Sequence, residues 1–154
     1  MMQRRQHQDP SKNLVGFVVG EVRYAVPIGD VREIVNPLPV VELPGAAANV
    51  LGVADYRDEV VPVVDLRRRF GLGAAAATRR TKWIVLGVSD RLVAIVVDAV
   101  TDVFRSDDAA LRPPPAVSVG ADRKAIAGVA TQSGDLVFVL DTARFDDVVA
   151  ETPA

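Results

Sequence analysis

The sequence predicts an all-β fold in which two small five-stranded β-barrels pack around a shared hydrophobic interface. Short runs rich in Val, Ile, Leu and Phe recur along the chain, with Gly and Pro between them. The order of these runs in the first half returns in the second half. Each half is the size of a small closed barrel, a form that removes exposed sheet edges. A barrel this small has little core of its own, so we expect the two to share an apolar surface.

The first half contains two expected hairpins, a short strand, a crossing and a short helix. The second hairpin carries polar residues at its tip, and the crossing is rich in proline, which suits an edge or an irregular segment. Asp65 is the expected N-cap of the helix, which Gly71 ends. The expected elements are strands 13–19 and 22–28, strand 30–35, crossing 36–45, strands 49–56 and 59–65, helix 66–70 and a connector over 71–81.

After the connector, the sequence predicts the same order of strands, crossing and helix a second time. Strands are expected on both sides of the turn Ser89-Asp90, then a further strand, a Pro-rich crossing and a last hairpin about Ser133-Gly134. Asp141 then opens a second helix. The ranges are strands 82–88 and 91–97, strand 98–104, crossing 111–117, strands 124–131 and 135–141, and a helix that follows residue 141.

A direct comparison of the two halves indicates a duplication. GVADYRDEVVPVVD (52–65) aligns without a gap over GVATQSGDLVFVLD (128–141), and YAVPIGDVREI (24–34) aligns over VAIVVDAVTDV (93–103), which pairs Val31 with Val100 and Glu33 with Asp102. The matches of Gly52 to Gly128 and of Asp65 to Asp141 carry most of the weight. We therefore expect subdomains at about 20–70 and 82–140, with terminal strands open to exchange, a disordered tail over 1–12 and a flexible end over 150–154.

The tip Asp55-Tyr56-Arg57-Asp58 is the strongest candidate for a functional surface. The equivalent tip of the second half is Thr131-Gln132-Ser133-Gly134, so ordinary turn residues suffice for the fold. A planar guanidinium beside an aromatic ring and two acids is typical of protein contact surfaces. The simpler alternative is that Arg57 only solvates the turn. The glycine in the second half further suggests a positive φ at Asp58.

Composition narrows the classes of function. Eighteen basic and 20 acidic residues give a net charge of −2, which does not favour nucleic-acid binding. The chain has no Cys, and its one His lies in the polar head, so neither a cofactor nor a metal site is expected. No apolar run is long enough to span a membrane. We expect a soluble, cytoplasmic protein.

The ordered series VGFVVGEVRYAVPIGDVREI, VLGVADYRDEVVPVVDLRRRFG, AIVVDAVTDVF, LRPPP and GVATQSGDLVFVLDTARF resembles the CheW family of bacterial chemosensory coupling proteins. The resemblance covers about 13–149, which is taken as one CheW-like domain. It implies two SH3-like barrels and no catalytic activity. It implies two partners, the cytoplasmic helical hairpin of a chemoreceptor and the regulatory domain of a CheA-type histidine kinase. Other CheW-like proteins in arrays are further partners to consider, and recruitment to membrane-associated arrays is implied with them.

The resemblance also implies two contact surfaces. The receptor-binding set is Val31 and Glu33 with the tip residues Asp55, Tyr56, Arg57 and Asp58. The family usually has Asn-Leu-Arg-Gly at this tip, so Arg57 is retained while the two aspartates add negative charge, and the true partner could belong to a divergent, non-flagellar system. The kinase-binding set lies in the crossing 36–45; the alternative there is a plain segment buried against the barrel. Its members are Pro37, Leu38, Val40 and Glu42.

The sequence also contains features of two other classes of function. An aspartic-protease-like enzyme would use Asp65 and Asp141, because paired carboxylates can share a proton. Both aspartates directly precede expected helices, however, where a capping role is the simpler explanation. A nucleic-acid binder would use RRRF (67–70) and RRTK (79–82), but few aromatic residues are available for base stacking.

Overall fold

The computed structural model describes residues 13–106, 111–113 and 125–145. The predicted end segments 1–12 and 150–154 lie outside this part of the chain. The first half contains strands β1 (Leu14–Val19), β2 (Val22–Pro27), β3 (Val31–Val35), β4 (Val50–Tyr56) and β5 (Glu59–Asp65), with the 3₁₀ helix η2 (Ile28–Asp30) and helix α2 (Leu66–Arg69). The second half contains β6 (Lys82–Val88), β7 (Arg91–Val97), β8 (Ala99–Phe104), β9 (Ile126–Gln132) and β10 (Asp135–Leu140), followed by the 3₁₀ helix η4 (Thr142–Phe145).

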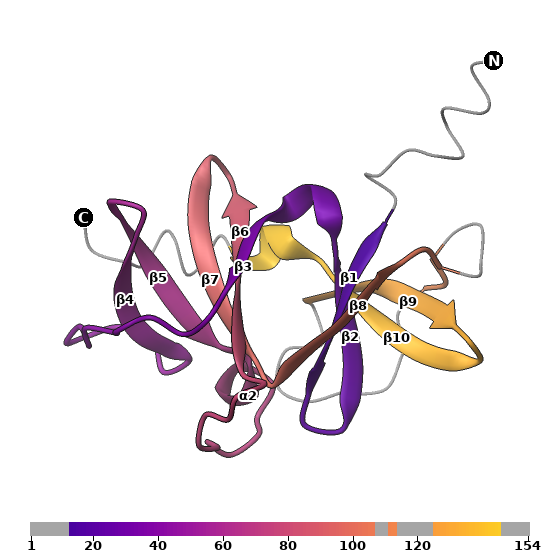
Figure 1. Ribbon diagram of the computed structural model, residues 1–154, viewed down its shortest axis with the longest axis horizontal. Helices are drawn as coiled ribbons and strands as arrows, with labels where there is room; N and C mark the ends of the chain where they lie inside the picture. The colour runs from indigo at the N-terminus through magenta and orange to yellow at the C-terminus, as the bar shows by residue number, and fades with distance from the viewer. Residues whose placement is uncertain (1–12, 107–110, 114–124, 146–154) are drawn as a thin grey trace.

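The strands form two five-stranded sheets, which confirms the predicted fold class. Their orders are β8-β1-β2-β10-β9 and β3-β6-β7-β5-β4. Figure 1 shows the two sheets side by side, with β4 at one end of the molecule and β9 at the other. We call the sheet that contains β3, β4 and β5 the first barrel and the sheet that contains β8, β9 and β10 the second barrel.

The strand pairing repeats between the two halves. Exchanging β1–β5 with β6–β10 turns one sheet order into the other. Each barrel takes a hairpin from one half and three strands from the other, an exchange of strands that the predicted subdomains at 20–70 and 82–140 had left open. The reason is that β2 and β7 each pair in parallel with the last strand of the opposite half, β10 and β5 respectively.

The crossing segments help to close each sheet into a barrel. Val41, which follows β3, pairs with Val53 of β4 through two backbone hydrogen bonds of 2.8 and 2.9 Å. In the second barrel Arg112 pairs with Val129 of β9 in the same way. A crossing that runs beside the outer strand covers its free backbone groups.

The matched glycines Gly52 and Gly128 allow these close approaches. A Cβ on Gly52 would lie 2.8 Å from the carbonyl carbon of Val41, and Gly52 also has a φ of +152°. A Cβ on Gly128 would lie 2.9 Å from the carbonyl oxygen of Arg112. The duplication therefore retains glycine where the crossing backbone leaves no room for a side chain.

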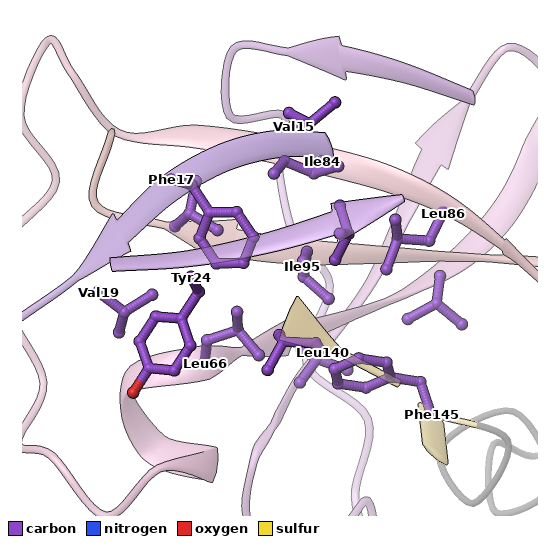
Figure 2. Close-up of a cluster of buried hydrophobic side chains, with 14 of the residues drawn as sticks. Val15, Phe17, Val19, Tyr24, Leu66, Ile84, Leu86, Ile95, Leu140 and Phe145 are labelled. Atoms are coloured by element: carbon purple, nitrogen blue, oxygen red, sulfur yellow. The ribbon is translucent and has the colours of Figure 1, made fainter. Parts of the chain in front are cut away.

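The largest group of buried side chains lies between the barrels. Tyr24 stacks against both Phe17 and Phe70, with ring centroids 6.0 and 4.9 Å apart respectively. Figure 2 shows how strands from both sheets, together with α2 and η4, point side chains into this cluster; it labels Val15, Phe17, Val19, Tyr24, Leu66, Ile84, Leu86, Ile95, Leu140 and Phe145. Smaller clusters fill the barrel interiors, so the shared interface is the main core.

Side-chain hydrogen bonds stabilise the two crossovers, where the chain passes from one barrel to the other. Between β7 and β8, Asp98 accepts hydrogen bonds from the amide of Gly20 at 2.7 Å and from Arg67 Nη1 at 2.8 Å. Between β2 and β3, Asp30 accepts a hydrogen bond of 2.8 Å from the Thr142 hydroxyl. Asp98 thus joins the β7–β8 crossover to α2, which follows β5. Asp30 likewise joins the β2–β3 crossover to η4, which follows β10.

Helix α2 ends one residue before the end predicted for it at residue 70. Asp65 caps α2 as expected, because its Oδ1 accepts a hydrogen bond from the amide of Arg67 at 3.0 Å. The helix predicted after residue 141 is a 3₁₀ helix over Thr142–Phe145, and the rest of its predicted range lies outside the described residues. Asp141 Oδ1 accepts from the amide of Ala143 at 3.1 Å, the same local geometry as at Asp65.

Candidate functional site: the seam of the first barrel

The tip of the β4–β5 hairpin is a two-residue loop in a left-handed conformation. Arg57 has a φ of 47° and Asp58 a φ of 68°, which confirms the positive φ predicted at Asp58. Positive φ at both loop residues is the pattern of a type I′ turn, whose twist matches that of the flanking strands. The loop holds Arg57 at a fixed position at the end of the hairpin.

Glu33 joins this tip to the opposite edge of the same sheet. It lies on β3, whereas Tyr56 and Arg57 belong to the β4 edge, and these two strands are the outermost strands of the sheet order. Arg57 donates from Nε to Oε1 and from Nη2 to Oε2 of Glu33, both at 2.9 Å, and the Tyr56 hydroxyl donates to Oε1 at 2.5 Å. The three side chains form the seam that closes the first barrel.

The hydrogen bonds of the seam favour its ionised form. The Arg57 hydrogen bonds, followed by the one from Tyr56, lower the pKa of Glu33 from 4.5 to about 2. The same contact with Glu33 raises the pKa of Arg57, and the hydrogen bond to Glu33 raises the pKa of Tyr56. Near neutral pH the seam is therefore a carboxylate paired with a guanidinium and a neutral phenol.

Arg57 remains accessible although it is held in place. Its side chain is 70% exposed, while that of Glu33 is 34% exposed. The guanidinium also lies 5.6 Å from the centre of the Tyr56 ring. Of the five N–H donors of an arginine, Glu33 takes two, so the seam presents further donors in a preset orientation.

The structure brings together three of the six residues predicted to bind a receptor. Val31 is half-buried and packs against the core between the barrels. Asp55 and Asp58 are exposed beside the seam, where Asp55 Oδ1 accepts a hydrogen bond from the Asp58 amide at 3.1 Å. Contact between these six residues and a receptor stays a prediction.

The crossing predicted to bind a kinase is divided between core and surface. Leu38 and Val40 are partly buried and pack against the side chains inside the first barrel. Pro37 and Glu42 are exposed. Part of the crossing is therefore packed against the barrel and part of it is exposed, and kinase binding stays a prediction.

The second barrel has a seam of its own, which the sequence analysis did not identify. Asp102, the counterpart of Glu33, accepts a hydrogen bond of 2.7 Å from Gln132, the counterpart of Tyr56. Arg23 from β2 adds an ion pair to Asp102 at 3.9 Å and a hydrogen bond to Gln132. The pairing of Glu33 with Asp102 in the aligned halves was the signal that could have revealed it.

Asp65 and Asp141, the two acids of the enzyme hypothesis, each have partners in the turn that follows them. Asp65 follows a strand of the first barrel and also pairs with Arg68 at 3.6 Å. Asp141 follows a strand of the second barrel and pairs with Arg144 at 3.7 Å. Each carboxylate is held by its own turn, which supports capping over proton sharing.

Across the ranges that the structure describes, no helix is long and apolar enough to cross a membrane.

Comparisons with known proteins agree on one family. A family model described as the CheW-like domain matches residues 13–148. The Chemotaxis protein CheW of Rhizobium meliloti is 35% identical over 130 residues, covering 84% of each chain. Protein FrzA of Myxococcus xanthus is 35% identical over 129 residues, covering 82% of this chain and 78% of its own. The crystal structure of the scaffolding protein TtCheW from Thermoanaerobacter tengcongensis superimposes with a TM-score of 0.77 at 26% identity, covering 85% and 89% of the two chains.

Proposed function

Because the chain belongs to the CheW-like family, we propose that it is a non-catalytic adaptor that couples a chemoreceptor to a CheA-type histidine kinase. In this role it works at the cytoplasmic face of a membrane-associated receptor array. The observation that carries the proposal is the seam of the first barrel, in which Glu33 holds an exposed Arg57 in a preset orientation.

The geometry of the seam suits recognition of a helical hairpin. A guanidinium with free donors beside the Tyr56 ring offers both hydrogen bonds and an apolar contact. Because Glu33 has already ordered the side chain, little rotamer freedom is lost when a partner binds. Contacts of this size are individually weak, and an array of many copies multiplies them.

The experiment compares the binding of receptor and kinase in one assay. Purified protein is co-sedimented with vesicles that carry a chemoreceptor and with the CheA-type kinase of the same organism. We expect Arg57→Ala to reduce recovery with receptor at a temperature at which its melting curve shows that the variant is still folded. Arg68→Ala is the matched control, because Arg68 is also an exposed arginine with an acidic partner.

If Arg57→Ala sediments with the receptor as well as the wild type does, the seam is not part of the receptor-binding surface of this protein. Failure of the wild-type protein to sediment with either partner would remove the adaptor role itself.

A second candidate is an adaptor of a pathway other than flagellar chemotaxis. The similarity to Protein FrzA, a relative whose name does not mention chemotaxis, is as high as that to the Rhizobium protein. Deletion of the gene in its source organism distinguishes the two. Loss of swimming responses with surface movement intact supports the flagellar role, and the reverse result supports the second candidate.

A further inference from the structure

Tyr56 connects the interior of the first barrel to the seam. The residue is only 5% exposed, and it belongs to the cluster of buried side chains inside the barrel, together with Trp83 and Leu92. Its hydroxyl donates to Glu33 Oε1 at 2.5 Å. A ring that is packed among other buried side chains has little freedom to move, so its hydroxyl is a donor with a fixed position.

The ion pair between Glu33 and Arg57 is more exposed than Tyr56. The side chain of Arg57 is 70% exposed and that of Glu33 is 34% exposed. Ion pairs near the surface are weak, because water competes for both charged groups and two flexible side chains must be ordered together. The pair alone is therefore a weak restraint on the orientation of Arg57.

Tyr56 adds a restraint through an oxygen that it shares with Arg57. Glu33 Oε1 accepts from both the Tyr56 hydroxyl and Arg57 Nε, and Glu33 Oε2 accepts from Arg57 Nη2. The hydroxyl fixes the carboxylate, and the carboxylate fixes the plane of the guanidinium through two parallel hydrogen bonds. The guanidinium also lies 5.6 Å from the centre of the Tyr56 ring. The buried ring thus acts on Arg57 in two ways, and only the first needs the hydroxyl.

The second barrel separates the closing of a seam from the display of an arginine. Gln132, at the position of Tyr56, also donates to the acid of its seam, Asp102, at 2.7 Å. The residue at the position of Arg57 is Ser133, so the tip there carries no cation. A donor that holds the acid of the opposite edge is therefore common to both barrels. In the first barrel the same contact has the additional effect of orienting an arginine.

We propose that the Tyr56 hydroxyl is a positioning group for receptor binding, which holds Glu33 so that Arg57 presents its remaining N–H donors in one orientation. The hydroxyl acts through the carboxylate and not by contact, because Tyr56 is buried and its phenolic proton is donated to Glu33. Arg57 is ordered when the protein folds, so less side-chain entropy is lost when the receptor binds. This inference rests on the proposed adaptor function and names the residue that orients the exposed arginine.

The first measurement follows Arg57 in the free full-length protein by NMR. The rate at which the Arg57 Nε proton exchanges with solvent reports its hydrogen bond to Glu33. Tyr56→Phe removes the hydroxyl and keeps the ring, and we expect it to speed this exchange at least about threefold. Tyr24→Phe is the matched control, because it removes the other phenol hydroxyl of the chain from a ring in the core between the barrels. It should leave the exchange at Arg57 unchanged.

The second measurement is the affinity for vesicles that carry a chemoreceptor of the same organism. We expect Tyr56→Phe to weaken binding about fivefold. In the Arg57→Ala background the same change should have no further effect, because no arginine is left to orient. A loss of stability alone would not depend on Arg57 in this way. Melting curves set a temperature at which every variant is folded.

Two controls test whether the effect is particular to the first seam. Tyr24→Phe should bind the receptor vesicles as the wild type does. Gln132→Ala removes the matching contact to Asp102 in the second barrel and should also leave receptor binding unchanged.

Four results would overturn the inference. If Tyr56→Phe leaves the exchange at Arg57 unchanged, the hydroxyl does not position the arginine. If the exchange becomes faster but receptor binding equals that of the wild type, the orientation is not used for receptor binding and the adaptor function stands. If Tyr56→Phe weakens binding equally with and without Arg57, the hydroxyl acts by another route. If the wild type does not bind the receptor vesicles, the adaptor function and the inference both fail.

Discussion

Glu33 and Arg57 come from the two opposite edges of one sheet and join them through a bidentate ion pair, with both N···O distances at 2.9 Å. Tyr56 adds a third contact to the same carboxylate. The pair therefore contributes both to closure of the first barrel and to the surface proposed for receptor binding. A substitution at either residue has to be judged by folding and by binding together.

The first prediction concerns pH. The pKa of Glu33 is about 2 in the folded protein and near 4.5 when unperturbed, so its stabilising effect is complete above about pH 4.5. That effect is lost as the pH falls from about 4.5 to about 2. We expect the melting temperature of the wild type to fall more steeply over this range than that of Glu33→Gln. Parallel pH profiles for the two proteins would contradict the lowered pKa.

The second prediction concerns the glycine beneath the crossing. Gly52→Ala should destabilise the protein by about 3 kcal/mol, because the added Cβ meets the Val41 backbone at a positive φ. Gly87→Ala is the control: Gly87 is an exposed strand residue with nothing within 4 Å of an added Cβ, and this variant should gain about 0.5 kcal/mol. Denaturant melts measure both. Equal effects would mean that the crossing moves away easily.

The third prediction concerns the tip turn. Asp58→Gly should raise stability by about 0.5 kcal/mol, because glycine adopts a φ of 68° without steric cost. Asp90→Gly, at the same position of the β6–β7 turn with a φ of 64°, should behave alike. Gly134→Ala should have the opposite sign. Chemical denaturation of the three variants checks this, and a loss of stability in both Asp→Gly variants would refute it.

The fourth prediction concerns the crossover between β7 and β8. Arg67 and Asp98 are 2.8 Å apart and are only 24% and 33% exposed. A double-mutant cycle with Arg67→Gln and Asp98→Asn should give a coupling of about 1 kcal/mol. The same cycle on Arg144 and Asp141, a more exposed pair at 3.7 Å, should give about 0.3 kcal/mol or less. Equal couplings would show that the crossover contact has no special strength.

The fifth prediction concerns the C-terminal 3₁₀ helix. Phe145 is fully buried in the core between the barrels, and the Arg69 guanidinium lies 4.6 Å from the centre of its ring. Phe145→Ala should therefore cost about 3–5 kcal/mol. Leu136→Ala, which removes a side chain that is 52% exposed, should cost less than about 1 kcal/mol. Calorimetry of both proteins would show whether η4 stabilises the fold as the structure indicates.

Local features of this protein could be predicted from its sequence alone. The strands 59–65, 82–88 and 91–97 agree with β5, β6 and β7 residue by residue, and the capping role of Asp65 was also found. Strand alternation, positive φ at a turn and N-capping depend on residues a few positions apart, so the chain carries them locally. The tip around Arg57 could be singled out because the second half supplied an internal comparison.

Tertiary structure decided which strands pair and therefore which residues meet. The duplicated halves carry similar valine-rich strands, so pairing within a half and pairing between halves offer nearly the same side chains to the core. The sequence pattern cannot separate these choices, because their difference lies in long-range packing across the shared interface. The partnership of Glu33 with Tyr56 and Arg57 and the second seam at Asp102 follow from barrel closure, which brings together residues that lie far apart along the chain.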